Sequence, residues 1–272
     1  MEPTSRQRGT GNAARRWRSV FGLSFSPLRR CDIVAALLEP VASGMGVRLF
    51  ATANLDHIVT LRSNEEFRRA YRMSWLITAD GAPVYFYARL MGVPLRERVT
   101  GADVMMDILR RWSPARHRPF FVVSSDEVAQ RIRRQLERRG FAADAIGIAV
   151  PPFDFERNEM FSAALVEDIG RHRPTHLVLG VGAPKSEIWT WRQRHQLGDV
   201  YVLAVGAAVE FAVGLKRRSP RWIGRIGLEW LWRFLFEPRR LFWRYFIRSW
   251  GIVPAMLADL RSGGRTVCSP SR

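Results

Sequence analysis

Short apolar, β-prone runs alternate with segments of helical periodicity, and this alternation constrains the fold more than any other feature of the chain. There are six such runs; most end at a small or polar residue near an expected helix start, and the run 146–150 ends at Pro151-Pro152. They cover residues 47–52, 75–78, 120–123, 146–150, 176–181 and 200–205. Strands that alternate with helices in this way predict an α/β fold: a mainly parallel, Rossmann-like sheet with helices on both faces.

Two turns, twenty residues apart, are predicted to form edges of one active site. Asp80-Gly81 follows the run 75–78, and Arg98 precedes Thr100, where a helix over 102–112 is expected to begin. In open α/β sheets, ligands bind at the carboxyl ends of the strands. A helix start offers free N–H groups and Arg98 offers a fixed cation, which together suit a phosphate. Taken alone, an Asp-Gly pair indicates only a turn, and an Arg-rich turn indicates a solvated surface.

Three further stretches carry polar residues or glycines at the ends of predicted strands. Thr52 and Asn54 follow the run 47–52, at the same kind of strand-to-helix edge as Asp80. Ser63 and Ser124 are predicted to cap the helices that follow them. The stretch 180–185, Gly-Val-Gly-Ala-Pro-Lys, resembles the start of a dinucleotide fingerprint but lacks its third glycine. We therefore interpret it as a tight loop through which the backbone can approach a phosphate.

Net charge and cysteine content restrict the class of partner. The chain has 43 Lys and Arg against 25 Asp and Glu, a formal net charge of +18, so an anionic partner is expected: nucleic acid, a phosphorylated substrate or an acidic membrane surface. Cys31 and Cys268 form no zinc or disulfide motif. The acidic pair Asp154 and Glu156 follows two prolines in a predicted loop, and we expect it to bind no metal. No stretch predicts a transmembrane helix or a secretory signal.

Composition divides the chain into four segments. Residues 1–28 are predicted to be a flexible basic tail, superficially like an organellar transit peptide, and residues 29–215 the α/β catalytic domain. Residues 216–250 hold ten Lys or Arg, two acidic residues and five of the ten Trp, and basic, Trp-rich amphipathic helices of this kind suit an anionic membrane surface. Alternatively, Trp230, Trp232 and Phe234 pack on the core. Residues 251–272 are predicted to be a C-terminal tail.

In their order along the chain, the motifs resemble those of the WecG/TagA/CpsF glycosyltransferases. The resemblance runs from about Val47 to Ile247. It is carried by Thr52-Ala-Asn54, Ala79-Asp80-Gly81, the run Glu97–Gly101, the run Gly180–Lys185, Gly214 with Arg218-Ser-Pro220, Gly227-Leu-Glu-Trp230 and Glu237-Pro-Arg-Arg240.

The resemblance implies a compact α/β fold of the GT-E type with a basic C-terminal appendage. It also implies an inverting transfer that needs neither metal nor cofactor, in bacterial exopolysaccharide, surface polysaccharide or teichoic acid synthesis. The donor would be a UDP-sugar carrying an N-acetylmannosamine-type sugar, its uronic acid or glucose. The acceptor would be a polyprenyl-diphosphate-linked sugar. A cytoplasmic protein, peripheral on the anionic inner leaflet of the plasma membrane, is expected.

Transferred by position, the resemblance makes Asp80 the general base and Thr52 and Arg98 its partners in the pocket. Ser186 stands where the family usually has Gln, and Glu210 stands where it commonly has Asp between aromatic residues. The C-terminal arginines would clamp the diphosphate of the acceptor. The expected substrate-binding residues are Asn54, Gly81, Gly182, Ser186, Glu210, Arg233, Arg240 and Arg244.

Two other classes of protein are weighed against this hypothesis. A basic nucleic-acid-binding protein is favoured only by the net charge, because no nucleic-acid-binding motif accompanies it and the Trp and Arg residues gather at one end of the chain. We therefore expect no nucleic acid partner. A nicotinamide-dependent dehydrogenase is favoured only by the incomplete glycine fingerprint.

Overall fold

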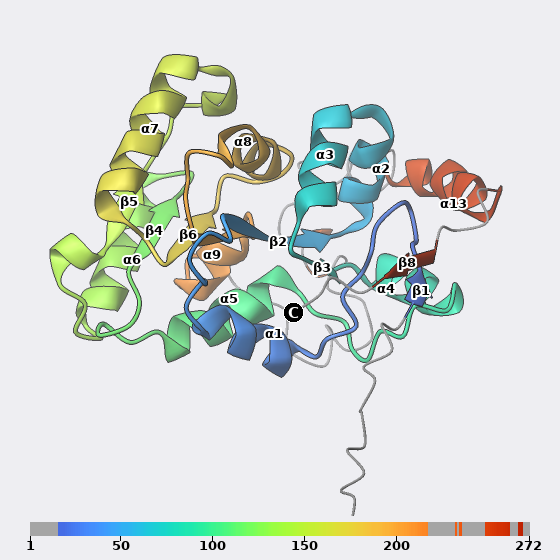
Figure 1. Cartoon of the computed structure of the whole chain (residues 1–272), viewed down its shortest axis with the longest axis horizontal. Coiled ribbons are helices and arrows are strands. Elements are labelled where there is room, and N and C mark those ends of the chain that lie inside the picture. The colour runs from blue at the N-terminus through green and yellow to red at the C-terminus, as the bar shows by residue number, and fades with distance from the viewer. Residues whose placement is uncertain (1–15, 217–231, 233, 236–247, 262–265, 269–272) are drawn as a thin grey trace, which may run out of the picture.

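Six runs rich in Val, Leu, Ile, Phe and Ala form one parallel sheet in the computed structural model, with the strand order β3-β2-β7-β6-β4-β5 (Figure 1). Residues 16–216, 232, 234–235, 248–261 and 266–268 are described. Each strand lies at a position predicted from the sequence, so the predicted α/β, Rossmann-like sheet is confirmed. The strands are β2 (Val47–Ala53), β3 (Leu76–Ala79), β4 (Pro119–Val122), β5 (Gly147–Ala149), β6 (His176–Leu179) and β7 (Val200–Ala204).

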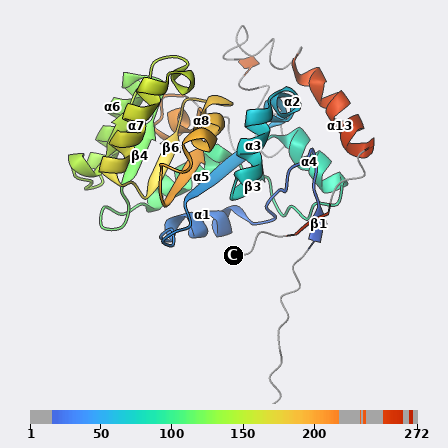
Figure 2. The same cartoon turned by 45° about the horizontal axis from the view of Figure 1, so that its top comes forward.

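Helices cover both faces of this sheet, because alternate strand residues point to opposite sides. Phe50, Val178 and Leu203 pack with helices α1, α5, α6 and α9, whereas their neighbours Leu49 and Leu177 pack with α7 and α8 on the other face. Figure 2 shows α1 and α5 below the sheet and α3, α7 and α8 above it. The main helices are α1 (Arg30–Leu38), α2 (Leu55–Ser63), α3 (Glu65–Met73), α4 (Ala82–Leu90), α5 (Gly101–Arg111), α6 (Asp126–Glu137), α7 (Glu159–His172), α8 (Lys185–Gln193) and α9 (Ala208–Ala212).

The parallel register brings the carboxyl ends of the central strands to one edge of the sheet. Thr52 of β2 lies opposite Thr78 of β3, and Ala53 lies opposite Ala79. On the other side of β2, pairing with β7 ends two residues earlier, at Ala51 and Ala204. Ligand sites of open α/β sheets are found at this edge.

Helix caps differ by one residue from two of the predictions. Asn64, not Ser63, caps α3 by accepting a hydrogen bond from Phe67 N at 2.9 Å. Ser125, not Ser124, caps α6. In both cases the cap is the extended residue immediately before the first helical residue, as capping geometry requires. The predicted cap at Thr100 is confirmed, because its hydroxyl accepts a hydrogen bond from Asp103 N at 3.1 Å.

Both terminal regions contain packed structure within the predicted tails. The strand β1 (Arg16–Arg18) pairs antiparallel with β8 (Thr266–Cys268), and Val20 and Phe25 are fully buried. The packed chain therefore begins before residue 29, because the apolar residues of 20–25 bury themselves despite the arginines around them. The predicted C-terminal tail likewise includes the helix α13 (Ile252–Arg261), which packs beside α2.

Most of the predicted basic appendage, residues 216–250, lies outside the described residues. Within it, Trp232 and Phe234 are half-buried and Leu235 is exposed. None of the helices in the described part of the chain combines the length and the apolar content that crossing a bilayer requires.

Candidate active site

Asp80 lies directly after β3, with its carboxylate directed at the start of α5. Its N–H donates to Ala53 O at 3.0 Å, which extends the ladder between β2 and β3 by one step. Its Oδ2 accepts a hydrogen bond from Gly101 N, the first residue of α5, at 3.3 Å. Free N–H groups at a helix start stabilise a carboxylate. The two turns that the sequence placed at one edge are therefore in direct contact.

Gly101 is the point at which α5 meets the ends of β2 and β7. A Cβ atom at Gly101 would lie 3.3 Å from both Oγ1 and Cγ2 of Thr52 and 3.5 Å from Cγ1 of Val205. Thr52 itself is only 4% exposed. This close approach favours a residue without a side chain, and it brings the Thr52 hydroxyl and the Asp80 carboxylate to the same helix start.

Arg98 contacts the same turn. Its Nη1 donates to the main-chain O of Asp80 at 3.1 Å, so the guanidinium group is fixed beside the residue that carries the carboxylate. The structure thus brings together Asp80, Thr52 and Arg98, which were the three predicted catalytic residues. Their chemical roles stay predictions.

The turns after β2 and β3 lie side by side. A Cβ atom at Gly81 would lie 3.6 Å from Cα of Asn54. Asn54 caps α2, and its Oδ1 accepts a hydrogen bond from His57 N at 3.1 Å. Gly81 occupies the cap position of α4. Asn54 and Gly81, two of the predicted substrate-binding residues, therefore lie next to Asp80.

The glycine loop after β6 touches the turn after β7. Gly182 has a φ of 87°, a conformation that favours glycine, and a Cβ atom at Gly206 would lie 3.5 Å from its Cα. Ser186 is buried in the first turn of α8, and its hydroxyl donates to Gly182 O at 3.1 Å. Ser186 therefore supports this loop from the protein interior, and contact with a ligand by Gly182 or Ser186 stays a prediction.

Glu210 lies on α9, at the same edge of the sheet. Its Oε2 forms an ion pair with Lys216 Nζ at 2.6 Å, and its Oε1 accepts a hydrogen bond from the hydroxyl of Ser124, after β4, at 3.4 Å. It thus lies near the end of β4, whereas Asp80 lies at the end of β3, the edge strand on the other side of the sheet. The other predicted substrate-binding residues, Arg233, Arg240 and Arg244, lie outside the described residues.

Three buried polar side chains near this edge were not predicted as functional residues. The Tyr71 hydroxyl lies 2.6 Å from His57 Nδ1 and 3.3 Å from Thr52 O. Glu187, in the first turn of α8, is 1% exposed, and burial raises its pKa to about 7. Burial also raises the pKa of Tyr71 well above its ordinary value, and the charges of Glu187 and Asp80 add to that effect. In the sequence, His57 and Glu187 resemble ordinary polar positions on helices, and Tyr71 resembles an ordinary core aromatic residue.

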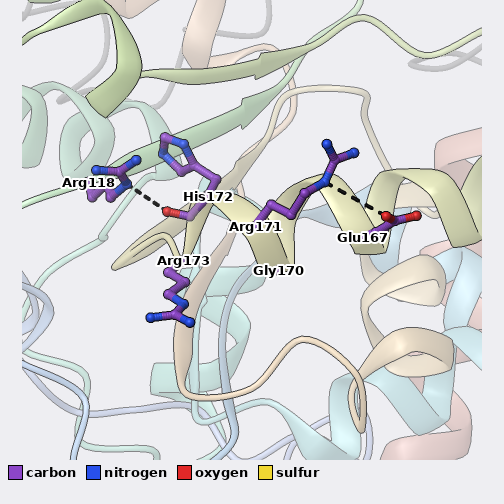
Figure 3. A pocket seen from close by; sticks show the side chains of 6 residues that line it. All are labelled: Arg118, Glu167, Gly170, Arg171, His172 and Arg173. Carbon is purple, nitrogen blue, oxygen red and sulfur yellow. Dashed lines mark hydrogen bonds and ion pairs between the residues drawn. The ribbon is translucent and has the colours of Figure 1, made fainter.

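A basic cavity of about 730 Å³ lies at the opposite edge of the sheet, where β4 and β6 begin (Figure 3). Within it, Arg118 Nε donates to His172 O at 2.6 Å and closes the end of α7. Ligand sites of parallel sheets lie at the carboxyl edge, so we do not assign catalysis to this cavity. It is lined by Arg118, Glu167, Gly170, Arg171, His172 and Arg173.

The acidic pair Asp154 and Glu156 does not form a cluster of carboxylates. Asp154 forms an ion pair with Lys185 Nζ at 2.7 Å. Phe155, which separates Asp154 from Glu156 in the sequence, is buried in the core. Within the described ranges, no three His, Cys, Asp or Glu side chains gather closely enough to hold a metal ion.

Comparison with known proteins matches residues 18–266 to the model of the glycosyl transferase WecG/TagA/CpsF family. Two similar relatives, from Staphylococcus aureus strains NCTC 8325 / PS 47 and MRSA252, are each named N-acetylglucosaminyldiphosphoundecaprenol N-acetyl-beta-D-mannosaminyltransferase. Each is 22% identical over 227 residues, which is 82% of this chain and 85% of the relative. These matches do not favour the nucleic-acid-binding alternative. With an α/β sheet and a carboxylate at its carboxyl edge, the chain belongs to the WecG/TagA/CpsF family of glycosyltransferases.

Proposed function

We propose that the protein transfers a sugar from a UDP-sugar to a polyprenyl-diphosphate-linked sugar, with Asp80 as the general base. The observation that carries the proposal is the Asp80 carboxylate at the carboxyl end of β3, held by Gly101 N at the start of α5. The names of the relatives, which act on a diphosphoundecaprenol-linked sugar, support the class of acceptor.

In the proposed reaction, a hydroxyl oxygen of the acceptor attacks the anomeric carbon of the donor. The bond from that carbon to the diphosphate oxygen breaks, UDP leaves with the electron pair, and Asp80 takes the hydroxyl proton. One displacement of this kind inverts the anomeric configuration. A positioned carboxylate contributes roughly 10²- to 10⁴-fold to such a step.

The leaving diphosphate needs positive charge or N–H donors, and the chain offers both without a metal ion. Arg98 is fixed at the Asp80 turn, and the loop at Gly182 lets main-chain N–H groups approach a phosphate. We therefore expect transfer to continue in excess EDTA. Loss of activity on chelation that Mg²⁺ or Mn²⁺ restores would contradict metal independence.

The identity of the donor sugar is best tested with a panel. The names of the relatives support N-acetylmannosamine as the first candidate sugar. UDP-N-acetylmannosamine is therefore tested first, with its uronic acid and UDP-glucose as alternatives. Purified protein is incubated with each UDP-sugar and a synthetic polyprenyl-diphosphate N-acetylglucosamine, and the products are identified by mass spectrometry. Transfer from at least one donor is expected. No transfer from any donor, together with salt-sensitive binding of random DNA, would contradict the proposal.

We also propose that the protein works on the cytoplasmic face of the plasma membrane, where the acceptor lipid is anchored. The net charge of +18 supports attraction to an anionic surface, and residues 216–250 are the proposed site of contact, with Arg233, Arg240 and Arg244 at the acceptor diphosphate. Truncation before Lys216 is expected to abolish liposome binding and transfer. If the folded, truncated protein uses a water-soluble acceptor at the full rate, the diphosphate clamp is wrong.

A further inference from the structure

The ladder between β2 and β7 stops one residue before Thr52, and among the described residues this leaves the Thr52 carbonyl without a strand partner. Leu49 O and Ala53 O both accept from the β3 side, from Trp75 N and Asp80 N. Because carbonyls alternate along a strand, Thr52 O faces the β7 side. There the next two N–H groups, those of Val205 and Gly206, both donate to Leu179 O of β6.

Tyr71 supplies the donor that β7 does not. Its hydroxyl reaches from α3 to Thr52 O at 3.3 Å, and the side chain is 1% exposed. A phenol has one hydrogen, so a hydroxyl that donates to Thr52 can only accept from its other neighbour. That neighbour is His57 Nδ1 at 2.6 Å, so donation to Thr52 O requires the His57 tautomer with hydrogen on Nδ1. In that tautomer, donation runs from His57 through Tyr71 to Thr52.

The surroundings keep this donor in place. Burial and the charges of Glu187 and Asp80 hold the pKa of Tyr71 well above its ordinary value, so the hydroxyl stays protonated at any physiological pH. The ring is held edge-on by Phe67, with 5.0 Å between ring centroids. The hydrogen bond is thus fixed by packing on one side and by His57 on the other.

We propose that Tyr71 is a positioning residue, which holds the end of β2 so that Thr52 meets Asp80 and Gly101 in the geometry needed for transfer. This inference rests on the proposed function, because it assigns Tyr71 an effect on the reaction through Thr52. It does not require Tyr71 to touch either substrate. A buried hydroxyl that only added stability would leave turnover unchanged when removed.

The chain contains a matched control for this hydrogen bond. Tyr201, at the start of β7, is also buried, and its hydroxyl donates to Ala36 O at 3.0 Å. It lies at the opposite edge of the sheet from Asp80. Tyr201→Phe therefore removes the same kind of bond, a phenol to a main-chain carbonyl, away from the proposed active site.

The test compares Tyr71→Phe and Tyr201→Phe in the intact chain, with turnover and melting temperature measured for both. We expect similar losses of stability, but roughly tenfold slower turnover only in Tyr71→Phe, with little change in KM for the donor, since a net hydrogen bond is worth about that factor. In a Thr52→Ala background, Tyr71→Phe should add almost nothing. Equal turnover of the two Phe variants, or a full additional loss in the Thr52→Ala background, would overturn the inference.

A second measurement needs no transfer activity, so it separates failure of this inference from failure of the proposed function. The ¹⁵N chemical shifts of His57 in the wild-type protein report which ring nitrogen carries hydrogen. We expect hydrogen on Nδ1, and we expect Tyr71→Phe to shift that resonance. An Nδ1 without hydrogen would overturn the proposed direction of donation. A wild-type protein that transfers no sugar, but has hydrogen on Nδ1, would instead contradict the proposed function.

Discussion

His176 at the amino edge of the sheet and Glu187 at its carboxyl edge are both buried, but they differ in their hydrogen bonds. At the amino edge, His176 Nε2 donates to Leu37 O at 2.7 Å, its Nδ1 lies 2.9 Å from the Thr175 hydroxyl, and its ring packs against other aromatic rings. At the carboxyl edge, Glu187 is 1% exposed, and its Oε2 lacks a hydrogen-bond partner among the described residues. His176 thus completes hydrogen bonds of the fold, whereas Glu187 is buried at a cost in stability when it is ionised.

This difference indicates where the chain retains chemistry. Unsatisfied or strained groups persist where function requires them, and stabilising contacts elsewhere compensate. Asp80, Thr52 and Gly101 meet within one turn of α5, and Glu187 and Tyr71 lie behind them. We therefore expect substitutions at the carboxyl edge to change turnover, and equivalent substitutions at the amino edge to change only stability.

The largest expected effect is that of Asp80→Asn. The amide can still accept a hydrogen bond from Gly101 N but cannot take a proton, so turnover should fall by roughly 10² to 10⁴, while UDP binding and melting temperature change little. Steady-state kinetics with saturating donor measure the change. A near-normal rate in the pure variant would remove Asp80 from the role of base.

His176 should make the fold sensitive to acid. An unfolded histidine takes up its proton near pH 6.5, but burial lowers the pKa of His176 to about 4. Between these values the unfolded state binds more protons, so the free energy of unfolding falls as pH falls, by about 3 kcal/mol for this shift. Urea unfolding at pH 7.5 and pH 4.5 should show a smaller acid loss in His176→Gln. Equal losses in the variant and the wild type would contradict the assignment.

Glu187 should have the opposite pH dependence. Burial raises its pKa from 4.5 to about 7, so between these values the folded state binds more protons and the free energy of unfolding falls as pH rises, again by about 3 kcal/mol. Glu187→Gln should therefore lose less stability between pH 4.5 and pH 8 than the wild type. A variant that is less stable than the wild type at pH 8 would contradict this prediction, because it would show that contacts in the core offset the cost of burying ionised Glu187.

Gly101→Ala should have a smaller effect, of about tenfold in turnover. The new Cβ would lie 3.3 Å from the Thr52 side chain, so Thr52 or the start of α5 must shift by a few tenths of an ångström, and misplaced reacting groups slow catalysis. Gly170→Ala is the matched control, because Gly170 lies within α7 with open space around its Cα. It should keep full turnover and gain up to about 1 kcal/mol of stability. Equal turnover in both variants would argue against tight packing at Gly101.

The sheet was predictable because each of its strands is a short apolar run bounded by turn residues, such as Val200–Ala204 before Gly206. The meeting of Asp80 with the start of α5 followed from the same pattern, since parallel strands end at one edge. The predicted helix caps Ser63 and Ser124 were each wrong by one residue, because the adjacent residues Asn64 and Ser125 cap a helix equally well.

The buried groups behind Asp80 could not be predicted in the same way. Glu187 follows Ser186 at the start of a helix, where an acidic residue usually faces solvent and the helix dipole. Tyr71 lies in a strongly amphipathic helix and resembles an ordinary core aromatic. Their roles depend on contacts between α3, α8 and the end of β2, which are far apart in the sequence.

The most direct test of the central claim is the anomeric configuration of the product. A single displacement with Asp80 as base must invert the α-linked sugar of a UDP-sugar donor, so NMR of the isolated product should show a β linkage. This result would agree with attack of the acceptor hydroxyl on the face of the sugar opposite UDP. A product with the retained α configuration would contradict the account, because it requires two displacements or a mechanism in which Asp80 is not the base.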